Sequence, residues 1–314
     1  MPASLVIRAY NEEKHIGRLL EGLQRQTLKD VEVILVDSGS TDATVSIAES
    51  FGAQVVHIRP EEFTFGRSLN LGVQAATREW IVIASAHVYP VYPDWLESLL
   101  RPFKDEKIAL TYGKQRGPDF AKYSERQIFH QWYPDESQPK QATAFCNNAN
   151  AAIRKSLWAK NNYDETLTGL EDLAWAKWAK EQGYEIAYVA EAEVIHVHNE
   201  TPRGVANRYR REALAFKKIH PESHFNLYDF FKLTATNIAS DLWHATRERA
   251  LLKNLASIFW FRVMQFHGTR MGYRDSSLVT PQLRETFYYA RERKPKDAAK
   301  RNVEPIRYND SGRK

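Results

Sequence analysis

Four apolar runs separated by helical patterns constrain the fold of this chain more than any other feature. The runs are rich in Val and Ile and apolar at nearly every position: SLVIRAY (4–10), VEVILVDS (31–38), AQVVHIR (53–59) and WIVIASA (80–86). Such runs predict strands that are buried on both faces. Because strands that alternate with helices usually form a parallel sheet covered on both sides, we expect a doubly wound α/β fold with a mostly parallel sheet.

The segments between these runs have the apolar spacing of amphipathic helices. They predict helices over 11–26, 41–52, 65–77 and 93–103. Residues that favour helix N-termini stand near several starts, namely Asn11, Thr41 or Asp42, and Pro93 with Asp94.

The composition limits the class of protein. A chain of 314 residues with 43% hydrophobic content can bury a large core, as one domain with an appendage or as two domains. The single cysteine, Cys146, has no partner for an internal disulfide, and no leader pattern precedes the first strand, so we expect the reducing cytoplasm. Cys146 itself fits a small buried hydrophobe. No run approaches the roughly 18 apolar residues of a membrane span.

The positive charge is concentrated late in the chain. The formal net charge is +5, and the surplus lies at 203–211 and 291–314. A basic surplus indicates acidic partners such as phosphate, an anionic lipid surface or nucleic acid. The chain has no recognised nucleic-acid reader motif and no aromatic platform on its strands, so we expect no nucleic-acid partner.

Small and polar residues follow three of the predicted strands, where open α/β sheets collect ligands. They are Ala9, Tyr10 and Asn11 after the first strand, Asp37, Ser38 and Gly39 after the second, and Ser85, Ala86 and His87 after the fourth. The turn after the first strand lacks GxGxxG, which argues against a dinucleotide-dependent dehydrogenase.

Two adjacent carboxylates, Glu171 and Asp172, open the helical pattern LAWAKWAKEQG. Acidic side chains are favoured at helix N-termini for structural reasons alone. The chain also carries Asp37 at a strand end and histidines at 87, 196 and 198, and this order favours a catalytic role for the pair.

Six segments in this order resemble the motif series of family 2 glycosyltransferases, which have the GT-A fold, a Rossmann-like α/β architecture. They are VIRAYNEE (6–13), VDSGSTDAT (36–44), FTFGRSLNLGV (63–73), NNANAAIRKSLW (147–158), GLEDLAWAKWAKEQGY (169–184) and AEVIHVHNET (192–201). The resemblance covers roughly the first two thirds of the chain.

The resemblance implies a role for each matching residue. Asp37 would bind the nucleotide base, Glu171 and Asp172 form the family's ED motif, and Asp172 would be the catalytic base. The other positions implied in nucleotide or donor binding are Ala9, Tyr10, Glu12, Ser38, Arg67, Asn70, Ser85, Ala86 and Arg203. We expect the helix N-terminus to keep Asp172 ionised at neutral pH and Glu171 to orient neighbouring groups.

The chain departs from the family at the fourth strand end, where an acidic DXD triplet usually binds a divalent cation. The triplet reads Ser85-Ala86-His87 and resembles the DXH version of the polypeptide N-acetylgalactosaminyltransferases. His196 matches the family's late metal-binding histidine, and strand alternation places His198 on the same side. The cofactor implied is Mn²⁺ or Mg²⁺ at these three histidines, although imidazole suits Mg²⁺ poorly. The alternative is a metal-free site in which Arg203, Arg208 or Arg210 carries the diphosphate charge.

The resemblance therefore implies an inverting transfer of a sugar from a nucleoside diphosphate donor to a hydroxyl of a glycan or a lipid-linked acceptor, in bacterial surface polysaccharide or glycoconjugate synthesis. The mechanism would be a single in-line displacement. A catalytically degenerate protein that only binds nucleotide sugars is the alternative, because Ser85 replaces a carboxylate.

The rest of the chain divides into three parts. We expect a catalytic domain over 1–222, with a nucleotide-sugar half at about 1–115 and an acceptor half at about 116–222, a helical extension over 223–292, and a basic, poorly ordered tail over 293–314. The segment 115–144 predicts an aromatic loop, which would either stack on an acceptor ring or be pinned to the core. The extension could rest on anionic lipid as a peripheral element at the inner face of a membrane, but we favour packing onto the catalytic domain or onto a second subunit of a homodimer.

Overall fold

The computed structural model describes residues 1–274 and 303–308. One eight-stranded sheet has the order β3-β2-β1-β4-β7-β6-β8-β5. The strands are β1 (Ala3–Ala9), β2 (Val31–Asp37), β3 (Gln54–His57), β4 (Trp80–Ser85), β5 (Val88–Pro90), β6 (Ile108–Arg116), β7 (Asn150–Arg154) and β8 (Glu185–His196). The helices are α1 (Ile16–Gln24), α2 (Thr44–Ser50), α3 (Phe65–Ala75), α4 (Trp95–Leu100), α5 (Tyr123–Trp132), α6 (Lys155–Trp158), α7 (Glu171–Glu181), α8 (Pro202–Ile219), α9 (Leu227–Arg247) and α10 (Leu251–Arg274).

The first half of the chain forms the predicted parallel sheet. Strands β1 to β4 lie in the order β3-β2-β1-β4 and pair in parallel, and α1 to α4 occupy the predicted helical segments. The sheet also contains β7 and β5 in antiparallel pairings, which the sequence did not predict. The segment 115–144 is also not a plain loop, because it contains the end of β6 and helix α5.

Alternating side chains of the central strands build a core on each face of the sheet. Val6 of β1 packs with α3 and α7 on one face, where Trp175 is fully buried. Leu5 and Ile7 pack on the other face with α1 and α4. Burial on both faces explains why these strands are continuous apolar runs rather than alternating ones. Cys146 lies in the first of these cores, as expected of a small hydrophobe.

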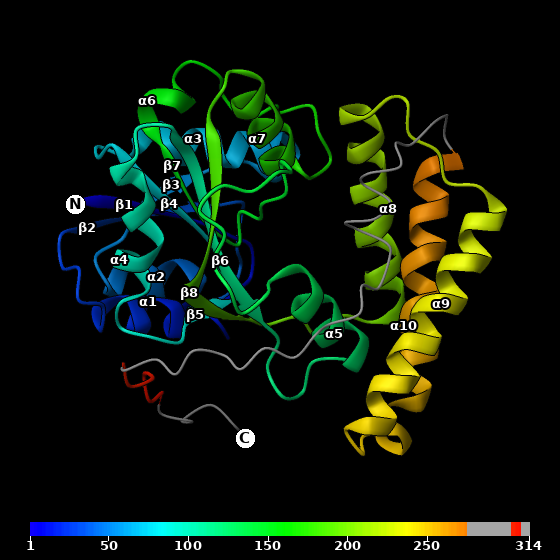
Figure 1. Ribbon diagram of the computed structural model, residues 1–314. Helices are drawn as coiled ribbons and strands as arrows, with labels where there is room; N and C mark the ends of the chain where they lie inside the picture. The colour runs from blue at the N-terminus through cyan, green and yellow to red at the C-terminus, as the bar shows by residue number, and fades with distance from the viewer. Residues whose placement is uncertain (275–302, 309–314) are drawn as a thin grey trace.

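Helices α8, α9 and α10 stand beside the α/β part as a separate layer (Figure 1). Helix α10 packs against both α8 and α9. Gly268 and Gly272 of α10 permit this closeness, because a Cβ atom at Gly272 would lie 2.5 Å from the carbonyl oxygen of Arg210 on α8. Within the described ranges, no helix combines the length and hydrophobicity that crossing a bilayer requires.

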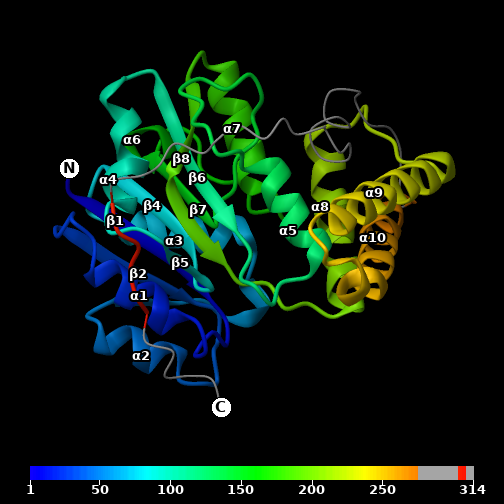
Figure 2. The same cartoon turned by 60° about the horizontal axis from the view of Figure 1, so that its bottom comes forward.

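Residues 303–308 return to the α/β part and pack against β5 and α1. These six residues belong to the segment for which the sequence predicts a poorly ordered tail. The remainder of the predicted tail, and 275–292 of the predicted extension, lie outside the described residues. The amide of Ile306 donates to the carbonyl of Val91 at 2.8 Å, and the hydroxyl of Tyr308 donates to the carbonyl of Pro90 at 2.5 Å. The Tyr308 ring meets Tyr89 edge to face. Figure 2 shows residues 303–308, in red, alongside α1.

Gly22 of α1 leaves the space that Tyr308 fills. A Cβ atom there would meet the Tyr308 hydroxyl and would lie 2.7 Å from the Pro90 ring. We therefore expect Gly22→Ala to lower the free energy of unfolding by about 1–3 kcal/mol in urea titrations, as overpacking does.

The matched control is Gly17→Ala in the same helix, where the nearest atom would lie at 3.9 Å. That substitution should be neutral or stabilising by about 0.5–1 kcal/mol, because alanine is the better helix former. Equal effects at both positions would contradict this account of residues 303–308.

Candidate active site

A polar cavity of about 220 Å³ lies between the sheet and α8. Its walls include seven of the residues predicted from the sequence, namely Ser85, His87, Glu171, Asp172, His196, His198 and Arg208. A larger hollow of about 360 Å³ lies at α4, but its lining contains neither a histidine nor the carboxylate pair. The convergence of titratable groups, rather than volume, therefore identifies the candidate site.

The carboxylate pair stands at the first turn of α7, as predicted. Both side chains are buried. Asp172 accepts hydrogen bonds from the amides of Asn148 at 2.9 Å and Leu173 at 2.8 Å. The residue before the pair, Leu170, has φ 56° in the left-handed region, which costs about 1–2 kcal/mol for a residue with a side chain. Strain of this kind is typical of functional sites.

The ionisation of Asp172 differs from the expectation. Burial, reinforced by the neighbouring Glu171, raises the pKa of Asp172 to about 7, although the two backbone amides and Arg8 act in the opposite direction. The prediction that the helix N-terminus keeps this pKa low is therefore wrong. Removal from water outweighs the helix N-terminus here. A carboxylate with a pKa near neutrality is suited to accept a proton from an alcohol at pH 7.

Arg8 of β1 is a site residue that the sequence analysis missed. Its Nη1 atom donates to Oε1 of Glu171 at 3.2 Å. Its guanidinium group also lies 4.8 Å from the centre of the Phe65 ring, and that of Arg211 of α8 lies 4.7 Å from the same ring. A single arginine within the apolar run SLVIRAY was the available signal, since a charge in a buried strand requires a partner.

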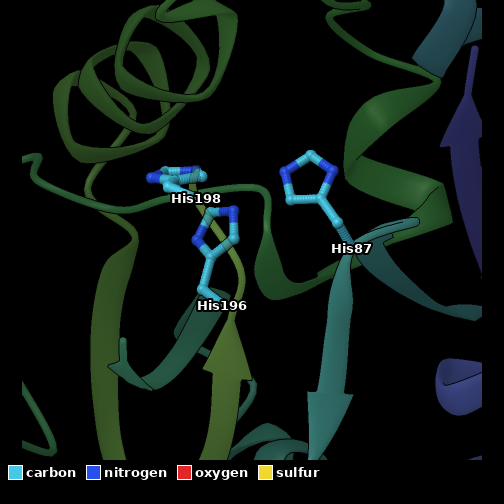
Figure 3. A group of neighbouring side chains, drawn as sticks. All are labelled: His87, His196 and His198. Carbon is cyan, nitrogen blue, oxygen red and sulfur yellow. The ribbon is translucent and has the colours of Figure 1, made fainter. Parts of the chain in front are cut away.

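Three imidazole rings of the cavity wall lie close to one another (Figure 3). His87 follows β4, His196 ends β8, and His198 lies two residues further on. The ring centres of His196 and His198 lie 4.0 Å apart, and those of His87 and His196 lie 5.0 Å apart. One nitrogen from each ring can be chosen so that all three lie within 4.8 Å of one another. The expectation that His196 and His198 share one side is confirmed.

Each of these histidines has its Nδ1 atom beside an oxygen acceptor. The partners are Oε1 of Glu12 for His87 at 2.8 Å, of Gln115 for His196 at 2.7 Å, and of Glu125 for His198 at 2.8 Å. In a neutral ring this arrangement places the proton on Nδ1 and leaves the Nε2 lone pair available. The Nε2 atom of His196 is buried and has no hydrogen-bond partner within the described residues.

Burial also keeps two of these rings neutral. It lowers the pKa of His196 well below the ordinary value, with His198 and His87 adding to the effect. It lowers the pKa of His198 likewise, reinforced by Arg208 and His87. Neutral imidazoles held through Nδ1 by an oxygen are the usual form of histidine in metal sites.

The residues expected around the nucleotide base and ribose lie outside this cavity, at the ends of β1 and β2, whereas Ser85 lines it. Ala9 pairs with Asp37 in the parallel register. Asp37 is buried, and its carboxylate accepts from the amides of Gly39 at 3.1 Å and Ser40 at 3.2 Å. The Ser38 hydroxyl donates to the Ala9 carbonyl at 3.1 Å, which ties the two strand ends together. Tyr10 is 57% exposed, and Ala86 is buried between Ser85 and His87.

Three further predicted donor-binding residues do not line the cavity. Arg67 and Asn70 of α3 both hydrogen-bond to Glu165, and Asn70 also accepts from the indole of Trp158. They hold the loop that follows α6. Arg203 is exposed on the first turn of α8. Helix α8 instead contributes Arg208 and Arg211 to the cavity wall.

The sequence is similar to a known protein family and to two named relatives. The sequence pattern of Glycosyl transferase family 2 matches residues 4–160. The chain is 30% identical over 222 residues to the O-antigen chain rhamnosyltransferase WbaN of Salmonella anatum, a match that covers 67% of this chain and 70% of the relative. It is 29% identical, with the same coverage, to the O-antigen chain rhamnosyltransferase RfbN of Salmonella typhimurium.

Solved structures resemble the fold over most of its length. The mannosyltransferase PcManGT from Pyrobaculum calidifontis, in complex with GDP-Man and Mn²⁺, superposes with a TM-score of 0.58 at 19% identity and 88% coverage of both chains. Staphylococcus aureus TarS 1-349, in complex with UDP-GlcNAc, gives 0.53 at 16% identity, with 88% of this chain and 91% of that chain covered. These likenesses establish the fold as GT-A-like.

Fold, cavity and relatives together define this protein as a glycosyltransferase enzyme. The chain belongs to glycosyl transferase family 2.

Proposed function

We propose that the protein transfers a sugar from a nucleoside diphosphate donor to a hydroxyl group, with inversion at the anomeric carbon. The observation that carries this proposal is the shared cavity wall, which brings the buried Asp172 carboxylate and the three imidazoles to one cavity. A base on one side and groups that meet a diphosphate on the other are what a single in-line displacement requires.

In this mechanism Asp172 takes the proton of the acceptor hydroxyl. Glu171, held by Arg8 at 3.2 Å, does not share that role because its charge is already paired. Glu171 instead raises the pKa of Asp172 through its negative charge. Arg8 thus acts through Glu171 as a positioning residue. On the donor side, Asp37 would accept from the nucleotide base, and Ala9, Tyr10 and Ser38 would lie beside the base and ribose.

The three histidines fit a divalent cation. One nitrogen of each ring lies within 4.8 Å of the others, and the Nδ1 atoms are held by Glu12, Gln115 and Glu125. The Nε2 atom of His196 is buried without a hydrogen-bond partner among the described residues. A bound cation would offset the negative charge of the departing diphosphate. We propose that Ser85-Ala86-His87 replaces the acidic triplet, as DXH does. A set of imidazoles suits a borderline cation such as Mn²⁺ better than Mg²⁺.

We propose a glycan, free or lipid-linked, as acceptor, and surface polysaccharide synthesis on the cytoplasmic side of a bacterial membrane as the setting. The named relatives WbaN and RfbN, which are O-antigen chain rhamnosyltransferases, support this assignment. The aromatic side chains of Phe129 and Trp132 line the cavity and would offer a stacking surface to a sugar ring.

The reaction should depend on pH through Asp172. Because the base must be deprotonated and its pKa is about 7, kcat/KM should rise about tenfold per pH unit below 7 and level off above it. Initial rates with saturating cation between pH 5.5 and 9 would measure this profile. A rate that is already independent of pH at 5.5 would contradict Asp172 as the titrating base.

Turnover of a panel of GDP-, UDP- and dTDP-linked sugars, a rhamnosyl donor included, tests the proposed function. Release of nucleoside diphosphate that requires an acceptor supports transfer. Nucleotide binding without turnover of any donor would favour the degenerate binding protein, for which Ser85 is the motivating residue.

A further inference from the structure

Helix α9 buries several polar side chains beside the apolar Leu233 and Ala245, and it exposes large apolar ones. Asp229, Thr234, Asn237 and Asp241 are buried, and large apolar side chains on the opposite side are exposed. The exposed residues are Leu227 (49%), Tyr228 (67%), Phe231 (62%) and Trp243 (54%). A surface helix of a soluble protein normally shows the reverse distribution.

An ion pair fixes this orientation. Arg262 of α10 donates to both carboxylate oxygens of Asp241, at 2.8 and 2.9 Å, and both residues are almost completely buried. Arg262 also donates to Gln265 at 2.9 Å. Turning the apolar side of α9 inward would leave this buried pair without its partners, at a large cost.

Helix α10 continues the apolar surface. Leu252, Leu255, Phe259 and Val263 follow one another at helical spacing, and all are exposed, Leu252 by 93%. The two helices are antiparallel neighbours (Figure 1). Eight of the eleven exposed large hydrophobic residues in the described part of the chain lie on α9 and α10, so the concentration is specific to this hairpin.

The charges around these side chains are almost all positive. The exposed cations from α9 to the end of α10 are Lys232, Arg247, Arg249, Lys253 and Arg274, and Glu248 is the exposed acidic residue of that span. Two of the cations lie against the exposed aromatic rings, with Lys232 5.5 Å from the centre of Tyr228 and Arg247 4.4 Å from that of Trp243. Aromatic and aliphatic side chains interleaved with cations match an anionic lipid surface.

We propose that the outward face of α9 and α10 docks on an anionic lipid bilayer as a peripheral contact. Charge decides between lipid and a second copy of the chain, because a two-fold interface would set these cations against one another. Helix α10 packs on α8, and α8 lines the cavity through Arg208 and Arg211. Docking would therefore place α10 and α8 between the membrane surface and the cavity, on the side from which a lipid-linked acceptor would approach. This last point rests on the proposed function, whereas the docking itself does not.

Vesicle flotation with the full chain tests the proposal. Wild type should float with vesicles of phosphatidylcholine mixed with phosphatidylglycerol and bind far less to phosphatidylcholine alone, and the binding should weaken as salt rises. The double variant Phe231→Gln with Trp243→Gln should bind at least about tenfold more weakly, since two large apolar side chains no longer enter the interface. Arg247→Gln and Lys253→Gln should each cost about fivefold.

The matched control is Phe120→Gln, which changes a phenylalanine that is 53% exposed but belongs to neither α9 nor α10 and should leave flotation unchanged. Circular dichroism shows whether each variant is folded. The rise in melting temperature on adding nucleoside diphosphate shows whether the donor site persists. Together they separate loss of docking from loss of transfer. Equal binding to both vesicle types would overturn the proposal. So would failure of the wild type to float, or a wild-type dimer that the double variant dissociates, because the face would then be a subunit interface.

Discussion

Asp172→Asn is expected to reduce turnover by about a hundred- to ten-thousandfold, the range that a positioned general base contributes, while nucleotide binding persists. Asparagine keeps the shape of the side chain and can still accept from the amide of Asn148, but it cannot take a proton from the acceptor. Turnover and the thermal shift produced by nucleoside diphosphate, measured on the same preparation, separate the two effects.

The same variant should be more stable than wild type above pH 7. The folded-state pKa of Asp172 is raised from its ordinary value of 3.8 to about 7, so the native carboxyl binds its proton more tightly than the unfolded one. The free energy of unfolding of the wild type therefore falls as the pH rises from about 4 to 7 and beyond. Asparagine has no such loss, and we expect it to gain about 1–2 kcal/mol at pH 8 and little near pH 4.

Glu181→Gln is the matched control, because it makes the corresponding change of charge at the exposed other end of α7. It should alter neither turnover nor the pH dependence of stability. Full activity in the Asp172 variant would remove this residue from the mechanism, and a variant that no longer binds nucleotide would show that the carboxylate is needed for folding instead.

His87→Ala should abolish the stabilisation that Mn²⁺ adds to bound nucleotide. A ligand that binds only the native state raises the melting temperature according to its affinity, and His87 supplies one of three imidazoles of the cluster. We expect the shift with nucleoside diphosphate alone to remain and the Mn²⁺-dependent increment to disappear. In the wild type, Mg²⁺ at the same concentration should give a smaller increment than Mn²⁺, since imidazole is a poor ligand for Mg²⁺.

His267→Ala serves as the control for that experiment, because His267 is exposed on α10, away from the cluster. An unchanged Mn²⁺ effect in the His87 variant would exclude His87 as a ligand. If neither cation changed the wild type, the metal-free alternative would gain support, with Arg208 and Arg211 as the cavity-lining cations that could meet the diphosphate.

Local sequence patterns were sufficient for the parallel half of the fold. A strand such as β1, buried on both faces, must be apolar at nearly every position, and this pattern is visible without coordinates. Helix α5 was missed, because its apolar periodicity is obscured by polar residues that are themselves buried, such as Ser124 and Glu125. The short antiparallel strand β7 offers five residues and no alternation, so only its pairing with β4 and β6 defines it.

The site, like the fold, contains residues that the sequence predicted and residues that it did not. Residue types and spacing predicted the carboxylate pair and the three histidines, because all of them lie on, or within two residues of, a helix or strand that the sequence pattern indicates. The partners Gln115 and Glu125 were not predicted, since they come from elements distant in the chain. The pKa of Asp172 could not be predicted either, because burial by distant segments determines it and an adjacent acidic residue adds to it.

The contact of residues 303–308 with β5 has a consequence for synthesis of the protein. In the sheet order β5 is a terminal strand, and it follows His87 directly. Those six residues leave the ribosome after every other described segment. The surface of β5 and α1 that contacts Tyr308 therefore lacks this contact until translation reaches residue 308. Uncovered strand edges are where nascent chains associate wrongly. Expression in the cell should therefore respond to changes at Tyr308 more strongly than the activity of the purified enzyme does.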